Sequence, residues 1–151
     1  MIPPTSQRVS AHTCDQVNAQ IRRETQQRIE QYRGASQQVI NQRLDELDRE
    51  WDTERTLETN AATLAFAGCV LAATVHRRWI YLPMAVTGFL LQHAVQGWCP
   101  PLPVIRRLGF RTMREIDEER MAMKTLRGDF DGLMANDGAS DPREILQAVE
   151  R

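Results

Sequence analysis

Three cysteines and three histidines are the side chains of this 151-residue chain best suited to nucleophilic, redox or metal chemistry. Cys14, Cys69 and Cys99 are odd in number and widely spaced, which is not the pattern of a disulfide framework. Cys99 precedes a proline, and a thiol there could accept a persulfide, bind a metal or bind haem. Arg106 and Arg107 follow and could lower the pKa of this thiol, because a nearby cation stabilises the thiolate. The alternative is a cysteine that only fills a small pocket.

His93 is the second candidate, because it lies inside a stretch that carries no charged residue. Gln96 follows three positions later, so the two side chains are expected to share one face of a helix and form a polar site within a membrane. The alternative is a neutral histidine that hydrogen-bonds within the protein. His93 and Cys99 are six positions apart, near opposite sides of a helix, and are therefore poor ligands for one ion.

Other catalytic patterns are missing from the sequence. We find no glycine-rich phosphate loop, nucleophile elbow, pair of catalytic carboxylates or metal-ligand spacing. Glu118 and Glu119 are expected on solvated helix faces. The sequence therefore predicts a protein without enzymatic activity, cofactor or metal. The net charge of −1 gives no reason to expect a nucleic-acid partner.

The candidate residues belong to a long uncharged region that one short basic segment divides. Residues 59–75 and 79–105 contain no Asp, Glu, Lys or Arg, and residues 76–78 are His-Arg-Arg. As helices, residues 59–75 and 79–98 would be about 25 and 30 Å long, against a hydrocarbon core of about 30 Å. The sequence therefore predicts an all-α membrane protein whose two spans form an antiparallel hairpin. A soluble hairpin buried in a core is the alternative.

The flanking charges predict three regions and an orientation. Residues 1–58 and 106–151 are polar and are expected to form amphipathic cytoplasmic helices, and residues 59–105 are the transmembrane hairpin. Arginines cluster beside the outer ends of the spans, whereas only Arg77 and Arg78 lie between them, so both termini are expected in the cytoplasm. Lys124 is the only lysine, which suggests codon bias in a GC-rich bacterium. No cleavable signal peptide is expected at the N-terminus.

Small residues give the first span one close-packing face, since they let helix backbones approach each other in lipid. The face could be a homo-oligomer seam or could pack against the second span of the same hairpin. Its members are Ala61, Ala65, Cys69 and Ala73, with Gly68 and Ala72 beside them.

Helix signals also mark the polar regions. Thr13–Gln16 and Thr112–Glu115 read as capping boxes that begin helices. A further helix from about residue 36 carries an apolar stripe that could form a short coiled coil or lie on the membrane surface. The stripe consists of Ile40, Leu44, Leu47 and Trp51.

Two further segments are assigned from their prolines and polar residues. Three prolines within residues 100–103 are expected to forbid a helix and to force an extended exit from the second span. Residues 136–140 are expected to form a loop, after which a final short helix begins near Asp141.

The order of these features resembles the YgaP-like inner-membrane transmembrane domain, a bacterial family of uncharacterised function. Glu54-Arg55 leads into an Ala/Gly-rich span, the second span ends in Gly97-Trp98-Cys99-Pro100, and Leu108-Gly109-Phe110 follows. The resemblance covers residues 54–112. Some members carry a rhodanese, a sulfurtransferase domain, so the resemblance implies sulfur chemistry and dimers formed by the membrane helices. Residues 1–53 are too short for a rhodanese, so sulfur transfer would need a partner.

The sequence as a whole predicts a small inner-membrane protein that is a scaffold or an accessory subunit of a membrane complex. Its expected partners are membrane lipid, further copies of itself, and another membrane protein or a sulfurtransferase. Two alternatives remain: a sulfur-relay or redox accessory protein that uses Cys99, and an oligomeric channel or carrier for a small solute that uses His93 and Gln96.

Overall fold

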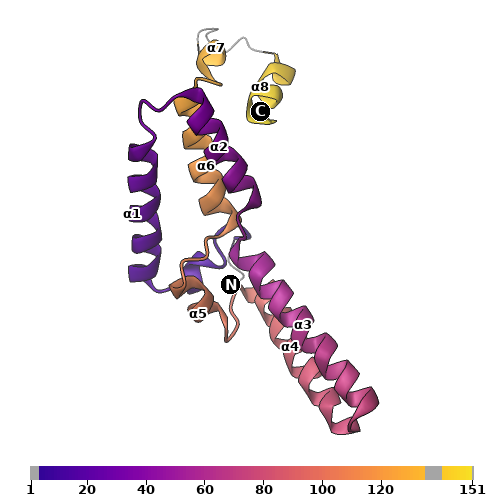
Figure 1. The fold of residues 1–151 in the computed structure, drawn as a ribbon. Coiled ribbons are helices and arrows are strands. Elements are labelled where there is room, and N and C mark those ends of the chain that lie inside the picture. The colour runs from indigo at the N-terminus through magenta and orange to yellow at the C-terminus, as the bar shows by residue number, and fades with distance from the viewer. Residues whose placement is uncertain (1–3, 135–140, 151) are drawn as a thin grey trace. The chain divides into compact units, whose positions relative to one another are not determined.

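A computed structural model of the chain describes residues 4–134 and 141–150, and throughout these residues the ordered elements are helices, without a β-strand (Figure 1). The predicted all-α class is therefore confirmed. The predicted loop at residues 136–140 lies outside the described residues. In chain order the elements are η1 (Ser10–His12), α1 (Asp15–Gln31), α2 (Gln37–Arg49), α3 (Thr53–Thr74), η2 (Arg77–Ile80), α4 (Tyr81–Gln96), α5 (Leu102–Arg107), α6 (Met113–Arg127), α7 (Asp131–Met134) and α8 (Pro142–Glu150).

The helices belong to two compact units. The first, here called the hairpin unit, comprises Met1–Arg22 and Trp51–Glu115, and the second, the polar-helix unit, comprises Arg23–Glu50 and Ile116–Arg151. Each unit joins segments that are far apart in the sequence. The boundaries differ from the three consecutive regions expected from charge alone, because the N-terminal segment and α5 pack with the hairpin.

Helices α3 and α4 lie side by side and antiparallel, and η2 connects them (Figure 1). Asp52 caps the start of α3, since its Oδ1 accepts a hydrogen bond of 2.7 Å from the Arg55 N–H. Gly97 ends α4 with φ 81°, a left-handed conformation that glycine adopts without steric cost. The predicted helical hairpin is thus present in the chain.

The length of the second helix differs from the prediction. Among the described residues, one helical stretch, Gln37–Thr74, is long and apolar enough to cross a membrane, and only 17% of its most apolar 18-residue segment is buried. The apolar part of that stretch lies in α3. Helix α4 has 16 residues, because residues 77–80 adopt a 3-10 turn and Gly97 stops the helix. A second helix of membrane-spanning length, expected over residues 79–98, is therefore not confirmed.

The two helices of the hairpin approach each other closely at Gly68. A Cβ atom at this position would lie 2.6 Å from Pro83 Cδ and 3.2 Å from Leu82 Cβ, so the helices approach each other here because the side chain is absent. Gly68 is buried, and three alanines of the predicted small-residue face are half-buried on the same side, whereas Cys69 and Ala73 are exposed. The inward residues are Ala61, Ala65, Gly68 and Ala72, spaced 4-3-4 instead of every four residues. For these four, the structure favours packing within the hairpin.

The prolines after α4 start a helix, and the predicted extended exit is wrong. Helix α5 begins directly after Pro101 and contains Pro103 in its first turn. A proline is tolerated there because the first N–H groups of a helix have no intrahelical acceptor.

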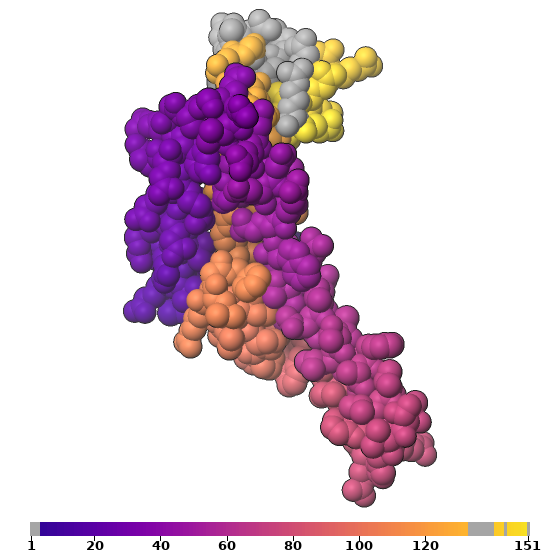
Figure 2. All heavy atoms as spheres, in the orientation of Figure 1, coloured from indigo at the N-terminus to yellow at the C-terminus, as the bar shows by residue number. Residues whose placement is uncertain are grey.

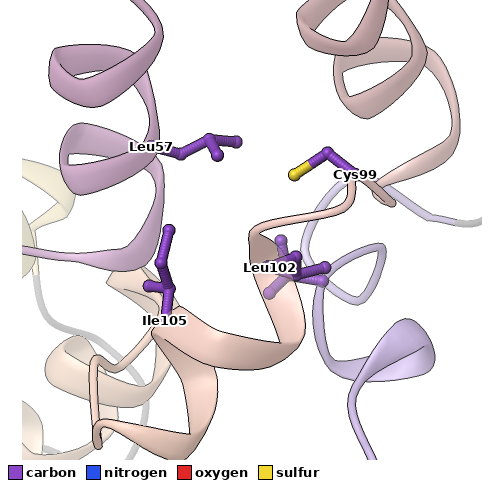
Figure 3. Close-up of a cluster of buried hydrophobic side chains, with 5 residues drawn as sticks. Leu57, Cys99, Leu102 and Ile105 are labelled. Carbon is purple, nitrogen blue, oxygen red and sulfur yellow. The ribbon is translucent and has the colours of Figure 1, made fainter.

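The core of the hairpin unit lies at the base of the hairpin, where α3, the segment after α4 and α5 meet. Leu57, Cys99, Leu102 and Ile105 form a buried cluster, which Val9 of the N-terminal segment completes. Figure 3 shows the Leu57 and Cys99 side chains directed toward each other from opposite sides of the cluster. This small core anchors the open end of the hairpin.

In the polar-helix unit, the apolar stripe of α2 is buried against α6. Ile40, Leu44 and Leu47 pack with Ile116 and Met123. The stripe therefore has a partner within the chain, and neither a coiled coil with another chain nor a membrane surface is needed to cover it. The expected fourth member, Trp51, lies beyond the end of α2, is 44% exposed, and stacks on the Arg55 guanidinium at 4.6 Å.

Glu119 corrects a further expectation, because this acid is buried and not solvated. Its side chain is fully inaccessible, and its two carboxylate oxygens accept hydrogen bonds from Arg28 Nε at 3.1 Å and Arg43 Nε at 2.9 Å. Arg43 also pairs with Glu46 at 2.9 Å. Burial of this carboxylate is tolerated because charge-assisted hydrogen bonds satisfy both oxygens.

Candidate functional site

The N-terminal segment ties the two ends of the hairpin together through Arg8. The Nη2 atom of Arg8 donates to Glu54 Oε1 at 2.8 Å, in the first turn of α3, and Nη1 donates to the Ala94 carbonyl at 3.1 Å, in the last turn of α4. Gly97 allows this approach, since a Cβ atom there would lie 2.5 Å from the Arg8 carbonyl oxygen. One side chain thus bridges both helices at the base.

His93 is buried beside this bridge. It is 4% exposed, and neither ring nitrogen has a hydrogen-bond partner among the described residues. Thr56 Oγ1 is likewise buried without a partner. The contact of Gly68 with Leu82 and Pro83 sets the antiparallel register and places His93 level with residues 57–58 of α3. Two unused polar groups therefore occur at one level of the hairpin.

The charged groups that act on His93 are Arg8, Glu54 and Glu58. Gln96, its expected companion, is exposed, and Gln92 Nε2 donates to it at 3.5 Å. The structure therefore does not bring His93 and Gln96 to one surface. His93 lies toward the inside of the hairpin and Gln96 on the outside.

Cys99 is in the apolar core, and its surroundings oppose the thiolate. The side chain is 1% exposed. Burial raises the pKa of the thiol, and the hydrogen bond with the Leu102 backbone only partly offsets this effect. The expectation that Arg106 and Arg107 lower this pKa is wrong, because the Arg106 guanidinium binds elsewhere. This position gives a protonated thiol that packs against Leu57 and Leu102.

Arg106 is the centre of a buried polar network that the sequence reasoning missed. It is 1% exposed and forms a two-pronged ion pair with Glu115, with distances of 2.7 Å from Nη1 and 2.8 Å from Nη2. It also donates to Thr13 Oγ1 at 3.2 Å, Asn18 Oδ1 at 3.0 Å and the Phe110 carbonyl at 2.9 Å. Four segments of the hairpin unit therefore meet at one guanidinium.

The capping box at Thr112 is confirmed and helps to position Glu115. The Thr112 N–H donates to Glu115 Oε2 at 2.7 Å, and the Glu115 N–H donates to Thr112 Oγ1 at 3.3 Å. Burial alone would raise the pKa of the Glu115 carboxyl, but the hydrogen bonds from Arg106 and Thr112 outweigh it and lower that pKa. The box was the signal in the sequence that could have identified Glu115 as a fixed carboxylate.

The expected capping box at Thr13 is wrong. The Thr13 hydroxyl donates to the Val9 carbonyl at 2.8 Å and accepts from Arg106, so it does not cap α1. Helix α1 instead starts from the Cys14 carbonyl, which accepts from the N–H groups of Val17 and Asn18.

Among the residues that the structure describes, the base of the hairpin offers structural hydrogen bonds and the imidazole of His93, which has no hydrogen-bond partner there. Over residues 4–134 and 141–150, no group of three or more His, Cys, Asp or Glu side chains is placed to hold a metal ion. The base of the hairpin is therefore best suited to fixing the geometry of α3 and α4.

Comparison with known proteins identifies no relative of this chain. No family model matches the chain, and neither a curated protein nor a solved structure matches it.

Proposed function

We propose that this protein is a membrane-anchored helical scaffold or accessory subunit, whose hairpin inserts into the lipid bilayer. The observation that carries the proposal is the exposure of large apolar side chains along both hairpin helices. Figure 2 shows this part of the chain as a continuous surface of magenta and pink atoms. The exposed side chains are Leu64, Phe66, Val70, Val75, Trp79, Ile80, Tyr81, Met84, Phe89, Leu91 and Val95.

Lipid explains this surface better than a protein partner does. Phe66 is 72% exposed and Leu91 is 67% exposed, and large contiguous apolar patches mark a protein or membrane contact. A surface that docks one protein would leave a polar face toward water, but residues 59–75 and 79–105 carry no charged side chain on any face. A bilayer covers all faces of the hairpin at once.

The dimensions are compatible with a thin bilayer. The 16 residues of α4 extend about 24 Å, which is several ångströms less than a hydrocarbon core of about 30 Å. The turn η2, which carries Arg77 and Arg78, would then lie beyond this span at the membrane–water interface. Trp79 and Tyr81 at the tip and Trp98 at the base are exposed, as expected of aromatic side chains at the two membrane–water interfaces. A mismatch of a few ångströms is accommodated by local thinning or by flanking side chains.

The charge distribution supports an inner-membrane location with both termini in the cytoplasm, and this orientation is part of the proposal. The polar helices would then present their surfaces to a cytoplasmic partner, either another membrane protein or a sulfurtransferase. Membership of the YgaP-like family is likewise proposed, on the residues quoted above. The exposed Cys69 and Ala73 leave a narrow face for a second copy of the hairpin.

The two alternatives receive less support. Cys99 is buried with a raised pKa, which opposes a sulfur relay through this thiol. A channel lined by His93 and Gln96 would need both side chains on the pore surface, but His93 is buried within the hairpin and Gln96 is outside.

Membrane fractionation and native mass determination test the proposal. The full chain should sediment with membranes, resist alkaline carbonate extraction and bring a second protein in fixed ratio when purified in mild detergent. Phe66→Glu with Leu91→Glu should abolish stable membrane integration, whereas the matched pair Arg22→Glu with Arg23→Glu on α1 should preserve it. A detergent-free, monodisperse soluble protein would overturn the anchor, and a particle containing only this chain would overturn the scaffold.

A further inference from the structure

The turn at the tip of the hairpin has a fixed backbone. The His76 N–H donates to the Leu71 carbonyl at 3.1 Å, which closes the end of α3. His76 Nδ1 then accepts from the Arg78 N–H at 3.0 Å, and the Trp79 N–H donates to the His76 carbonyl at 3.0 Å. The side chains of Arg77 and Arg78 therefore project from a turn that is organised before any ligand arrives.

Both tip arginines are exposed, and neither has a counter-ion in the part of the chain that the structure describes. Neither Arg77 nor Arg78 makes a hydrogen bond through its guanidinium, or an ion pair, with any residue the structure describes, whereas Arg8 and Arg106 each bind a carboxylate. No Asp or Glu occurs between residues 59 and 114, so the sequence supplies no acid near the turn. A counter-ion for these two adjacent guanidinium groups would therefore have to come from outside the hairpin.

Exposed aromatic and aliphatic residues flank the two arginines in the sequence of the turn. Trp79 is 44% exposed, Tyr81 is 68% exposed, and the aliphatic Val75 and Ile80 are exposed beside them. A free inorganic anion would use the guanidinium groups alone. A phospholipid uses all of these groups, because its phosphate pairs with guanidinium in two-pronged geometry while its glycerol and upper acyl region contacts aromatic and aliphatic side chains.

We propose that the hairpin tip, formed by Arg77, Arg78, Trp79 and Tyr81, binds the phosphate groups of anionic phospholipids in the leaflet that the tip reaches. This inference rests on the proposed insertion of the hairpin. It goes further by assigning a ligand class to the turn. Each arginine near an anionic membrane surface contributes enough attraction that the pair should give roughly a 30-fold preference for anionic over zwitterionic lipid.

The test is lipid titration of the detergent-purified full chain, followed by native mass spectrometry. Phosphatidylglycerol should bind about 30-fold more tightly than phosphatidylcholine, and Arg77→Gln with Arg78→Gln should reduce the preference to less than about threefold. The matched pair Arg22→Gln with Arg23→Gln, also adjacent and exposed, should retain the preference. Arg77→Lys with Arg78→Lys should retain part of it, because lysine keeps the charge and loses the two-pronged bond.

Three outcomes would overturn the inference. These are an unchanged lipid preference in the tip glutamine variant, an equal loss in the α1 variant, and full displacement of the lipid by millimolar inorganic phosphate, which would identify a free-anion site. Carbonate extraction of each variant separates this inference from the proposed function. A wild-type chain that fails to integrate removes the anchor itself, whereas an integrated chain without lipid preference removes only the tip site.

Discussion

Gly68→Ala should weaken the hairpin, although alanine is the better helix former. Removing a glycine from a helix interior stabilises the helix by about 1 kcal/mol. At Gly68, however, the added Cβ would lie 2.6 Å from the ring carbon Pro83 Cδ, and a proline ring cannot rotate away. Overpacking of this kind costs about 1–3 kcal/mol. We therefore expect a net loss in the free energy of unfolding of up to about 2 kcal/mol.

Gly88→Ala is the matched control within the same hairpin. Gly88 is in the interior of α4, and a Cβ atom there would meet nothing within 4 Å. The same substitution should therefore stabilise by about 1 kcal/mol, through helix propensity alone. The two variants should differ in sign.

Unfolding by titration of a denaturing detergent into mild-detergent micelles, followed by circular dichroism, measures both variants. Gly68→Ala should shift the midpoint down and Gly88→Ala should shift it up. If both substitutions stabilise to the same extent, Gly68 does not contact Pro83, and the register used to place His93 beside residues 57–58 is refuted. A larger residue, Gly68→Leu, should lower the midpoint further because the rigid neighbour remains.

Three further predictions concern the base of the hairpin. Glu115→Gln should cost about 3–5 kcal/mol at neutral pH, because it leaves the Arg106 charge buried without its partner. The folded-state pKa of Glu115 is below the ordinary value of 4.5, so the stabilisation by this ion pair is fully present above pH 4.5 and is lost as the pH falls through the folded-state pKa. In unfolding measurements over a pH series, the difference in free energy of unfolding between the wild type and Glu115→Gln should therefore disappear in acid. Cys99 should resist a maleimide in the folded protein while Cys14, which is exposed and lies outside the hairpin, reacts at once; mass spectrometry of labelled peptides checks this, and rapid labelling of Cys99 would contradict its burial. His93→Leu should raise the free energy of unfolding by about 1–3 kcal/mol, because it removes two unpartnered buried nitrogens, and a loss of similar size would show that they bind a ligand or water.

The sequence predicted features that depend on neighbouring residues. The absence of charge over residues 59–75 located most of α3, the Thr112–Glu115 spacing located a real capping box, and the 4-3 spacing of Ile40, Leu44 and Leu47 identified a buried stripe. Each is a local pattern whose physical cause lies within one or two helical turns. Such patterns do not identify the partner, and the stripe proved to pack on α6.

The features that were missed depend on contacts between distant segments. Arg106 was considered for its effect on Cys99, but its partners Thr13 and Asn18 are about ninety positions earlier in the chain. Glu119 is in a charged stretch that resembles a solvated face, and only the approach of Arg28 and Arg43 makes its burial possible. A spacing rule carries no information about such pairs.

The connections within the hairpin unit explain why large apolar side chains lie on the outer faces of its helices. Arg8 ties α3 and α4 at the base, and Gly68 brings them together near the middle, so the narrow inward face is filled by small side chains. The larger side chains, such as Phe66 and Leu91, therefore point outward from both helices. In the polar-helix unit the apolar residues of α2 and α6 are already buried against each other. A two-helix hairpin with a small interior and a large apolar exterior is unfavourable in water, because its apolar side chains are hydrated. In lipid, as proposed above, these side chains contact acyl chains, and the close backbone contact between the helices supplies the packing.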